Sequence, residues 1–259
     1  MKAYEQNWVR LPLEKAYNVR ELGGYPTASG IQTAYHRFLR ADDTSTLTQA
    51  DIDFLLGYGV RTVIDLRSDK EAADLQDPFM TMEGIRYVQI PYLGRDLTDA
   101  TQMQSSDLEK GLAVLYRSIL QNQSLTKEIF EVIADTEEGC VLFHCTVGKD
   151  RTGVLAMLLM SLAGADRQDC IANYEQTFSN LCRKPGFLHM VNECKKYKME
   201  EMLYSRPETM ANCYDWLMDT YGSTEAYLRD CGLSEETMDI VRRRMFALPY
   251  RNRKEATLP

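Results

Sequence analysis

The chain has 259 residues, with 30 lysines and arginines against 38 aspartates and glutamates, and its formal net charge is -8. This acidic balance argues against a nucleic-acid partner, because phosphate backbones are bound by clustered basic side chains. The first 20 residues lack the apolar stretch of a secretory signal, and the longest largely apolar run, Val154–Leu162, is too short to span a membrane. Seven cysteines without a CxxC pair indicate reduced thiols. We therefore expect a soluble, cytoplasmic protein without an integral membrane segment.

The first 150 residues alternate short apolar runs with helical patterns, and a strongly apolar helix follows them. The predicted strands are Arg37–Arg40, Val60–Leu66, Ile85–Ile90 and Cys140–His144. The predicted helices are Asp51–Tyr58, Asp69–Gln76, Leu108–Leu120, Leu125–Ile133 and Arg151–Leu162. Thr48 and Asp51 resemble a capping box at the first helix, and Ser124 is the expected N-cap of the fourth. Residues 94–106 are polar and without periodicity, which predicts a loop.

After residue 165 the pattern is helical throughout. The expected helices are Asp166–Phe178, Leu188–Leu203, Pro207–Tyr221, Thr224–Asp230 and Ser234–Met245. Methionines such as Met199 and Met210 recur at helical spacing and are expected in the core, with a lid formed by part of this region as the alternative. The sequence therefore predicts one α/β domain over residues 1–259, with a central, mostly parallel sheet flanked by helices and a helical C-terminal part from about residue 165.

The most informative segment is His144–Gly153, with the sequence HCTVGKDRTG. It lies between a predicted strand and a predicted helix, a context in which backbone N–H groups and the helix N-terminus converge on one anion-binding spot. Cys145 begins the loop and Arg151 ends it. A thiol in such a position ionises more readily and becomes a nucleophile, and a guanidinium fits two phosphoryl oxygens at once. The pattern predicts a cysteine nucleophile in a phosphate-binding loop.

The other residues of this loop have supporting roles. We expect the Thr152 hydroxyl to donate to the thiolate, Gly148 to let the loop turn with its amides inward, and Gly153 to allow close packing of the helix start. Lys149 is expected to add positive charge at the mouth, and His144 to orient the loop through backbone hydrogen bonds rather than act as a base. The predicted phosphate-binding residues are Thr146, Val147, Gly148, Lys149, Asp150, Arg151 and Thr152.

This segment resembles the His-Cys-x5-Arg-Thr signature of cysteine-dependent protein tyrosine phosphatases, and its Gly-Lys-Asp-Arg-Thr-Gly form is similar to a bacterial tyrosine and lipid phosphatase branch. Asn18–Gly24 resembles an N-terminal element of that branch, with Glu21 in place of the usual Asp. Phe38–Ala41 and Val63–Ser68 are similar to two of its strands, although Ala41 replaces a Ser. The resemblance covers roughly residues 15–247. It implies the protein tyrosine phosphatase-like fold and a phosphocysteine intermediate.

The general acid that protonates the leaving oxygen is left open by the sequence. Many phosphatases of the superfamily use the Asp of a Trp-Pro-Asp loop, but Trp8 and Trp216 do not precede such a sequence. Two candidates remain: Asp150 within the loop, and Asp96, where the resemblance implies another active-site Asp. Asp99 is the fallback. A structural carboxylate is the alternative for Asp150, and a solvated loop carboxylate for Asp96.

Three arginines outside the signature, Arg20, Arg40 and Arg67, could extend a positive rim. We prefer a structural role for them as partners of buried carboxylates such as Asp65. The isolated histidines do not indicate metal ligands, and we expect neither a metal nor a cofactor.

The predicted function is hydrolysis of phosphotyrosine on a phosphorylated protein, with inorganic phosphate as product. Phosphoserine, phosphothreonine and the phosphoinositides of a phospholipid substrate are further candidate substrates. Two alternatives use the same loop. One is thiol-based sulfur or arsenate chemistry, against which the Arg151–Thr152 pair and the missing CxxC argue. The other is a silent module that binds phosphate without turnover, against which the intact Cys145 and Arg151 argue.

Overall fold

The computed structural model describes residues 7–93 and 108–246. Within them a five-stranded sheet has the order β1-β2-β5-β3-β4. The strands are β1 (Arg20–Glu21), β2 (Phe38–Ala41), β3 (Val60–Asp65), β4 (Arg86–Gln89) and β5 (Cys140–His144). All neighbours are parallel except β1 and β2, which are antiparallel. The expected mostly parallel sheet is confirmed.

The strand register brings three carboxyl ends together. His144 at the end of β5 pairs with Ala41 at the end of β2 on one side and with Asp65 at the end of β3 on the other. The segments that follow these strands therefore begin at one edge of the sheet. In open parallel sheets this edge is where ligands bind.

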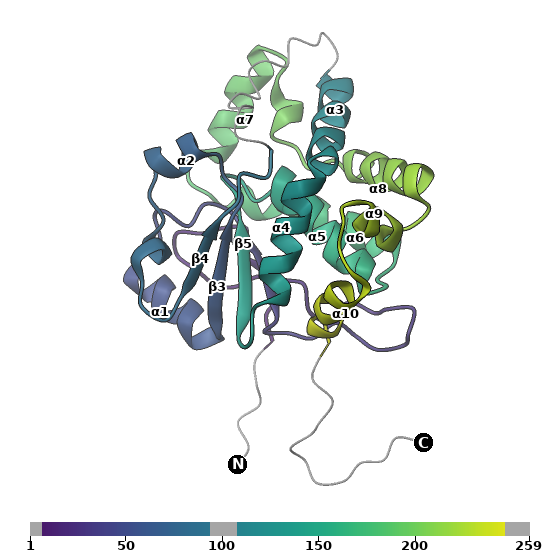
Figure 1. The fold of residues 1–259 in the computed structure, drawn as a ribbon. Helices are drawn as coiled ribbons and strands as arrows, with labels where there is room; N and C mark the ends of the chain where they lie inside the picture. Colours follow the sequence, from purple (N-terminus) through teal and green to yellow (C-terminus); the bar gives the residue numbers. More distant parts are fainter. Residues whose placement is uncertain (1–6, 94–107, 247–259) are drawn as a thin grey trace.

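Both faces of the sheet are covered, as a parallel sheet requires. In β5, Leu142 points into a cluster with α1 (Gln49–Tyr58) and the N-terminal segment. Phe143 points into the larger cluster on the opposite face, formed with α4 (Gln123–Ala134) and α5 (Asp150–Leu162). Figure 1 shows α4 and α5 beside the sheet.

The remaining helices complete the two layers. They are α2 (Asp69–Asp74), α3 (Leu108–Gln121), α6 (Arg167–Leu181), α7 (Phe187–Lys196), α8 (Pro207–Tyr221), α9 (Thr224–Asp230) and α10 (Glu235–Arg244). Two short 3-10 turns are η1 (Pro78–Thr81) and η3 (Glu200–Met202). In Figure 1, α6, α8, α9 and α10 lie on the other side of α4 and α5, and α7 lies at one end of the molecule. None of the described helices is long and apolar enough to cross a bilayer.

Most predicted elements are found within a few residues of their expected limits, and the Thr48–Asp51 capping box is present at α1. Two predictions are wrong. Ser124 lies inside α4, whose N-cap is Asn122. The helix expected over Leu188–Leu203 ends at Lys196, because Lys198 adopts a left-handed backbone with φ of 54°. The loop expected over 94–106 lies outside the described residues.

Candidate active site

The loop that carries Cys145 connects β5 to α5 at the carboxyl edge of the sheet. The Cys145 side chain is buried, with 2% of its surface exposed. Gly148 has a φ of 68°, and a Cβ atom there would lie 2.5 Å from the carbonyl oxygen of Ala41. A side chain is therefore excluded by both backbone conformation and space, as expected for this glycine. Gly153, at the start of α5, lies against the Tyr174 ring, and a Cβ there would approach it to 3.1 Å.

Buried amide and guanidinium groups hold the loop from below. Asn18 Nδ2 donates to the carbonyl oxygens of Val147 and Gly148, both at 3.2 Å. Arg40 Nη2 donates to the same Gly148 oxygen at 2.7 Å. With its carbonyl oxygens engaged on this side, the loop is fixed in one conformation. Asn18 is itself tied to the end of β2, because its backbone N–H donates to Asp42 Oδ1 at 2.9 Å.

Arg20 and Arg40 are structural, as preferred, but their partners differ from the expected carboxylates. Arg40 Nη1 donates to Asn173 Oδ1 at 2.6 Å, and Arg20 Nη2 donates to the Asn173 carbonyl oxygen at 2.6 Å. Both arginines are 1% exposed. Burial lowers the pKa of Arg40 to about 10, against the electrostatic attraction of Cys145. These arginines connect the loop to α6 and do not form a surface rim.

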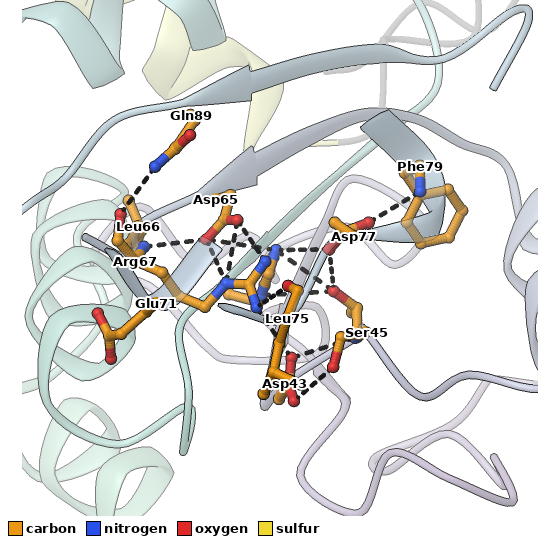
Figure 2. A network of polar contacts seen from close by, with 12 residues as sticks. Asp43, Ser45, Asp65, Leu66, Arg67, Glu71, Leu75, Asp77, Phe79 and Gln89 are labelled. Carbon is orange, nitrogen blue, oxygen red and sulfur yellow. Dashed lines mark hydrogen bonds and ion pairs between the residues drawn. The ribbon is translucent and has the colours of Figure 1, made fainter. Parts of the chain in front are cut away.

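Arg67 has the carboxylate partner that the sequence predicted. Its Nη2 lies 2.7 Å from Asp65 Oδ2, and its Nη1 lies 3.2 Å from Asp43 Oδ1. Figure 2 shows the guanidinium enclosed between these carboxylates, with the Leu75 carbonyl beside it. Arg67 is 1% exposed. It therefore joins the ends of β2 and β3 and is not available to a ligand.

His144 lies directly beneath the loop, fully buried between two carboxylates. Its Nε2 lies 3.2 Å from Asp77 Oδ2 and 3.7 Å from Asp65 Oδ1. Burial alone would lower the pKa of His144, but the hydrogen bond to Asp77 and the charges of both carboxylates outweigh it and raise the pKa. The expectation that His144 orients the loop through backbone bonds is thus corrected: the imidazole is anchored by carboxylates, which also leaves it unsuited to act as a base.

These same three side chains are also the only described group with metal-ligand geometry. The ligand atoms of Asp65, Asp77 and His144 lie within 4.8 Å of one another. The Arg67 guanidinium donates to the Asp65 carboxylate, and the Phe79 N–H and the Thr44 hydroxyl both donate to Asp77. The protein's own donors saturate this cluster, so its residues do not fit a metal.

Arg151 has a partner that the sequence analysis missed. Glu71, at the start of α2, accepts from Arg151 Nη1 at 2.6 Å and from Nη2 at 2.9 Å. Burial acts to raise the pKa of Glu71, but the hydrogen bonds and charge of Arg151 prevail and hold it well below its ordinary value. Glu71 takes the Nη1–Nη2 edge of the guanidinium, and Nη2 also donates to Thr146 Oγ1 at 3.4 Å, so a second anion on the Nε–Nη2 edge would replace this long contact. Glu71 also accepts from Thr146 Oγ1, which fixes the first residue after Cys145.

Lys149 departs from its expected position at the mouth. Its ammonium is 1% exposed, donates to the carbonyl oxygens of Met202 and Tyr204, and lies 3.4 Å from Asp150 Oδ1. These acceptors satisfy it inside the protein, so it ties the loop to the segment around η3. Binding of phosphate through the Lys149 side chain would require it to leave these partners.

Asp150 is placed at the start of α5, where a carboxylate is favoured by the helix dipole. Its Oδ1 accepts from the Tyr116 hydroxyl at 2.7 Å, and Tyr116 is in turn 2.7 Å from the Tyr174 hydroxyl. The Asp150 side chain is 27% exposed. The other acid candidates, Asp96 and Asp99, lie outside the described residues.

The Thr152 hydroxyl is buried, and it has no hydrogen-bond partner in the described parts of the chain. An unsatisfied buried hydroxyl is costly. It is therefore available to a group that binds in this loop.

A cavity of about 340 Å³ adjoins the outer side of the loop. Thr146 and Val147 form one wall. Lys184, in the turn before α7, and Phe187 and Met190, in the first turn of α7, form the other. The inner side of the loop is thus covered by Asn18 and Arg40, and its outer side faces the cavity.

The sequence matches the model of the tyrosine phosphatase family over residues 11–247. The chain is 36% identical over 137 residues to a tyrosine-protein phosphatase from Nostoc commune, a match that covers 53% of this chain and 47% of that protein. It is 25% identical over 273 residues to the triple specificity protein phosphatase PtpB from Mycobacterium tuberculosis, covering 89% of this chain and 96% of the relative. A solved structure of TpbA from P. aeruginosa in complex with pTyr is 13% identical and covers 76% of this chain and 87% of TpbA, with a TM-score of 0.33.

The family match extends over nearly all of the described residues. These residues include the Cys145 loop at the carboxyl edge of the mostly parallel sheet. The chain belongs to the tyrosine phosphatase family. It spans about half the length of the Nostoc commune relative.

Proposed function

We propose that the protein hydrolyses phosphotyrosine through a phosphocysteine intermediate on Cys145. The observation that carries the proposal is that Cys145 begins the loop leading into α5 and acts electrostatically on Arg151, whose guanidinium Glu71 holds in place. Loop amides and Arg151 bind the phosphoryl oxygens, and Cys145 Sγ attacks phosphorus opposite the leaving oxygen. The P–O bond breaks as the S–P bond forms.

The second half of the reaction releases inorganic phosphate. Water attacks phosphorus and gives its proton to the carboxylate that protonated the leaving oxygen, the S–P bond breaks, and the thiolate returns. We propose that the Thr152 hydroxyl, which has no other partner among the described residues, donates to the departing sulfur. This hydrogen bond stabilises the thiolate as a leaving group. No step draws on a metal or cofactor.

We propose Asp150 as the proton donor to the leaving oxygen. It lies within the loop and is partly exposed, and Tyr116 fixes its carboxylate. Asp96 stays the alternative. Replacing each with Asn separates them: loss of the true acid slows substrates with poor leaving groups far more than those with good ones.

The substrate range is proposed to extend to phosphoserine, phosphothreonine and phosphoinositides. Support comes from the similarity to PtpB, whose name describes triple specificity. The cytoplasm is proposed as the location, since all seven cysteines are free and a thiol nucleophile must stay reduced.

The test is turnover of an aryl phosphate in the presence of a chelator. We expect wild-type activity and its loss in Cys145→Ser, while Cys182→Ser, the same change at a half-buried thiol of α6's C-cap, retains it. Turnover that survives Cys145→Ser would refute the mechanism. Sulfur transfer from thiosulfate, or tight phosphate binding with no turnover of any phosphoester, would support the two rival functions instead.

A further inference from the structure

The segment Arg183–Met199, which contains α7, exposes large apolar side chains. Leu188 is 51% exposed, Met190 43%, Tyr197 75% and Met199 40%. Among the described residues these are four of the ten large apolar side chains with such exposure. The prediction that Met199 packs in the core is therefore wrong, although Met210 does. Such clustering on a surface indicates an interaction site.

The same segment has a positive net charge, opposite in sign to that of the whole chain. It carries five basic residues and one acidic residue, Glu193, whereas the rest of the chain has 25 basic and 37 acidic residues. The basic residues are Arg183, Lys184, Lys195, Lys196 and Lys198. An otherwise acidic protein thus has a basic pole, which attracts and orients it toward a negative surface.

The opposite side of α7 faces the phosphate loop. Phe187 and Val191, one helical turn apart, are 4% and 3% exposed and pack in a cluster that includes Val147 of the loop. Lys149 fastens the same region through the carbonyls of Met202 and Tyr204. The segment is therefore fixed to the candidate active site. In Figure 1, α7 stands at one end of the molecule, on the same side as α2.

We propose that Arg183–Met199 is a docking surface for an anionic lipid membrane. Basic side chains near such a surface are drawn to acidic headgroups, while Leu188 and Met199 enter the boundary between headgroups and acyl chains. An acidic polypeptide would form ion pairs with the lysines, but it would not bury the exposed apolar side chains that alternate with them. The mixture of both kinds on one short segment favours the lipid surface.

Docking would set the position of the phosphate loop. Only the thickness of α7, about 10 Å, separates its outer surface from the loop. Docking through the outer side of α7 would therefore hold the loop at a fixed distance from the membrane surface. The binding itself does not rest on the proposed phosphatase activity, so the two can fail separately.

The test is co-sedimentation of the full chain with vesicles of phosphatidylcholine alone or with phosphatidylserine added. We expect binding to the anionic vesicles only. Reversal of three charges, Lys195→Glu with Lys196→Glu and Lys198→Glu, weakens it at least about a hundredfold, since each basic side chain near the surface contributes about a factor of five. Replacing Leu188 and Met199 with Ser weakens it about fivefold or more.

The matched control reverses three basic side chains elsewhere: Lys127→Glu with Arg229→Glu and Arg243→Glu, on α4, α9 and α10. The expected change in vesicle binding is less than about twofold. Equal loss in this control would show that net charge alone governs binding and would overturn the proposal. So would wild-type binding to anionic vesicles no stronger than to neutral ones, or capture by polyglutamate that is insensitive to the Leu188 and Met199 changes. Turnover of a soluble aryl phosphate, measured on every variant, reports separately on the proposed function.

Discussion

Arg67 and Arg151 both bind carboxylates beside the same β3–α2 connection, but in different surroundings. The pair of Arg67 with Asp65 is closed, with side-chain exposures of 1% and 0%. The pair of Arg151 with Glu71 is open, with 13% and 35%. A buried pair that loses one partner leaves an uncompensated charge, whereas a half-exposed pair exchanges readily with solvent and ligands. The closed pair therefore joins the ends of the strands, whereas the open pair leaves Arg151 able to exchange partners, as the proposed function requires.

The largest expected effect is on the closed pair. Arg67→Ala leaves Asp65 and Asp43 without their cation, and we expect the free energy of unfolding to fall by about 3–5 kcal/mol. Urea denaturation measures it. The control is Arg167→Ala, which removes a surface arginine from Asp215, with side-chain exposures of 34% and 49%, and is expected to cost less than about 1 kcal/mol. Similar losses in both variants would erase the distinction between closed and open pairs.

Arg151→Lys tests the open pair through catalysis. Lysine keeps the charge but cannot bind two oxygens in one plane, so we expect kcat/KM for an aryl phosphate to fall at least about a hundredfold. The free energy of unfolding should change little. Arg167→Lys is the matched control. A loss of activity explained entirely by unfolding would contradict the assignment of Arg151 to phosphate binding.

Glu71→Gln is a smaller change at the same pair. The amide loses the charge that orients Arg151, and we expect kcat/KM to fall about tenfold, or about 1.4 kcal/mol. Steady-state kinetics measure it, with Glu71→Asp expected to recover part of the loss. An increase in kcat/KM would show instead that Glu71 competes with phosphate for Arg151.

The smallest expected effect concerns pH and the His144–Asp77 contact. Because the folded state raises the pKa of His144 above its ordinary 6.5, this contact stabilises the protein fully below pH 6.5 and loses its contribution as pH rises through the folded value. At the acidic end, the lowered pKa of Asp77 means that its contribution is lost as pH falls below 3.8 through the folded value. NMR titration should show a lower His144 pKa in Asp77→Asn, with the exposed His189 as internal reference. An unchanged His144 pKa would contradict the network.

Local patterns predicted much of this molecule. The apolar runs of β3 and β5, the capping box at Thr48 and the glycine of the phosphate loop each depend on neighbours in sequence. The strand β1 was missed because two residues, Arg20 and Glu21, show no periodicity. The early end of α7 was missed because Lys198, neither glycine nor proline, breaks the helix.

The contacts that define the site are nonlocal, and the sequence did not reveal them. Glu71 and Arg151 are 80 residues apart, and Tyr116 and Asp150 are 34 apart. The loop position of Lys149 suggests a side chain at the surface. In the structure the side chain is buried, and its ammonium donates to carbonyl oxygens more than 50 residues away in sequence. Such pairings follow from the packing of α2, α3 and η3 around the loop, which no local motif specifies.

The central claim is that Cys145 forms a covalent bond to phosphorus. The most direct measurement is rapid acid quenching during turnover of an aryl phosphate, followed by peptide mass spectrometry. We expect a phosphoryl group on the peptide that contains Cys145, formed at the rate of aryl alcohol release and absent from Cys145→Ser. Turnover with no phosphorylated cysteine, or with the phosphoryl group on another residue, would contradict it.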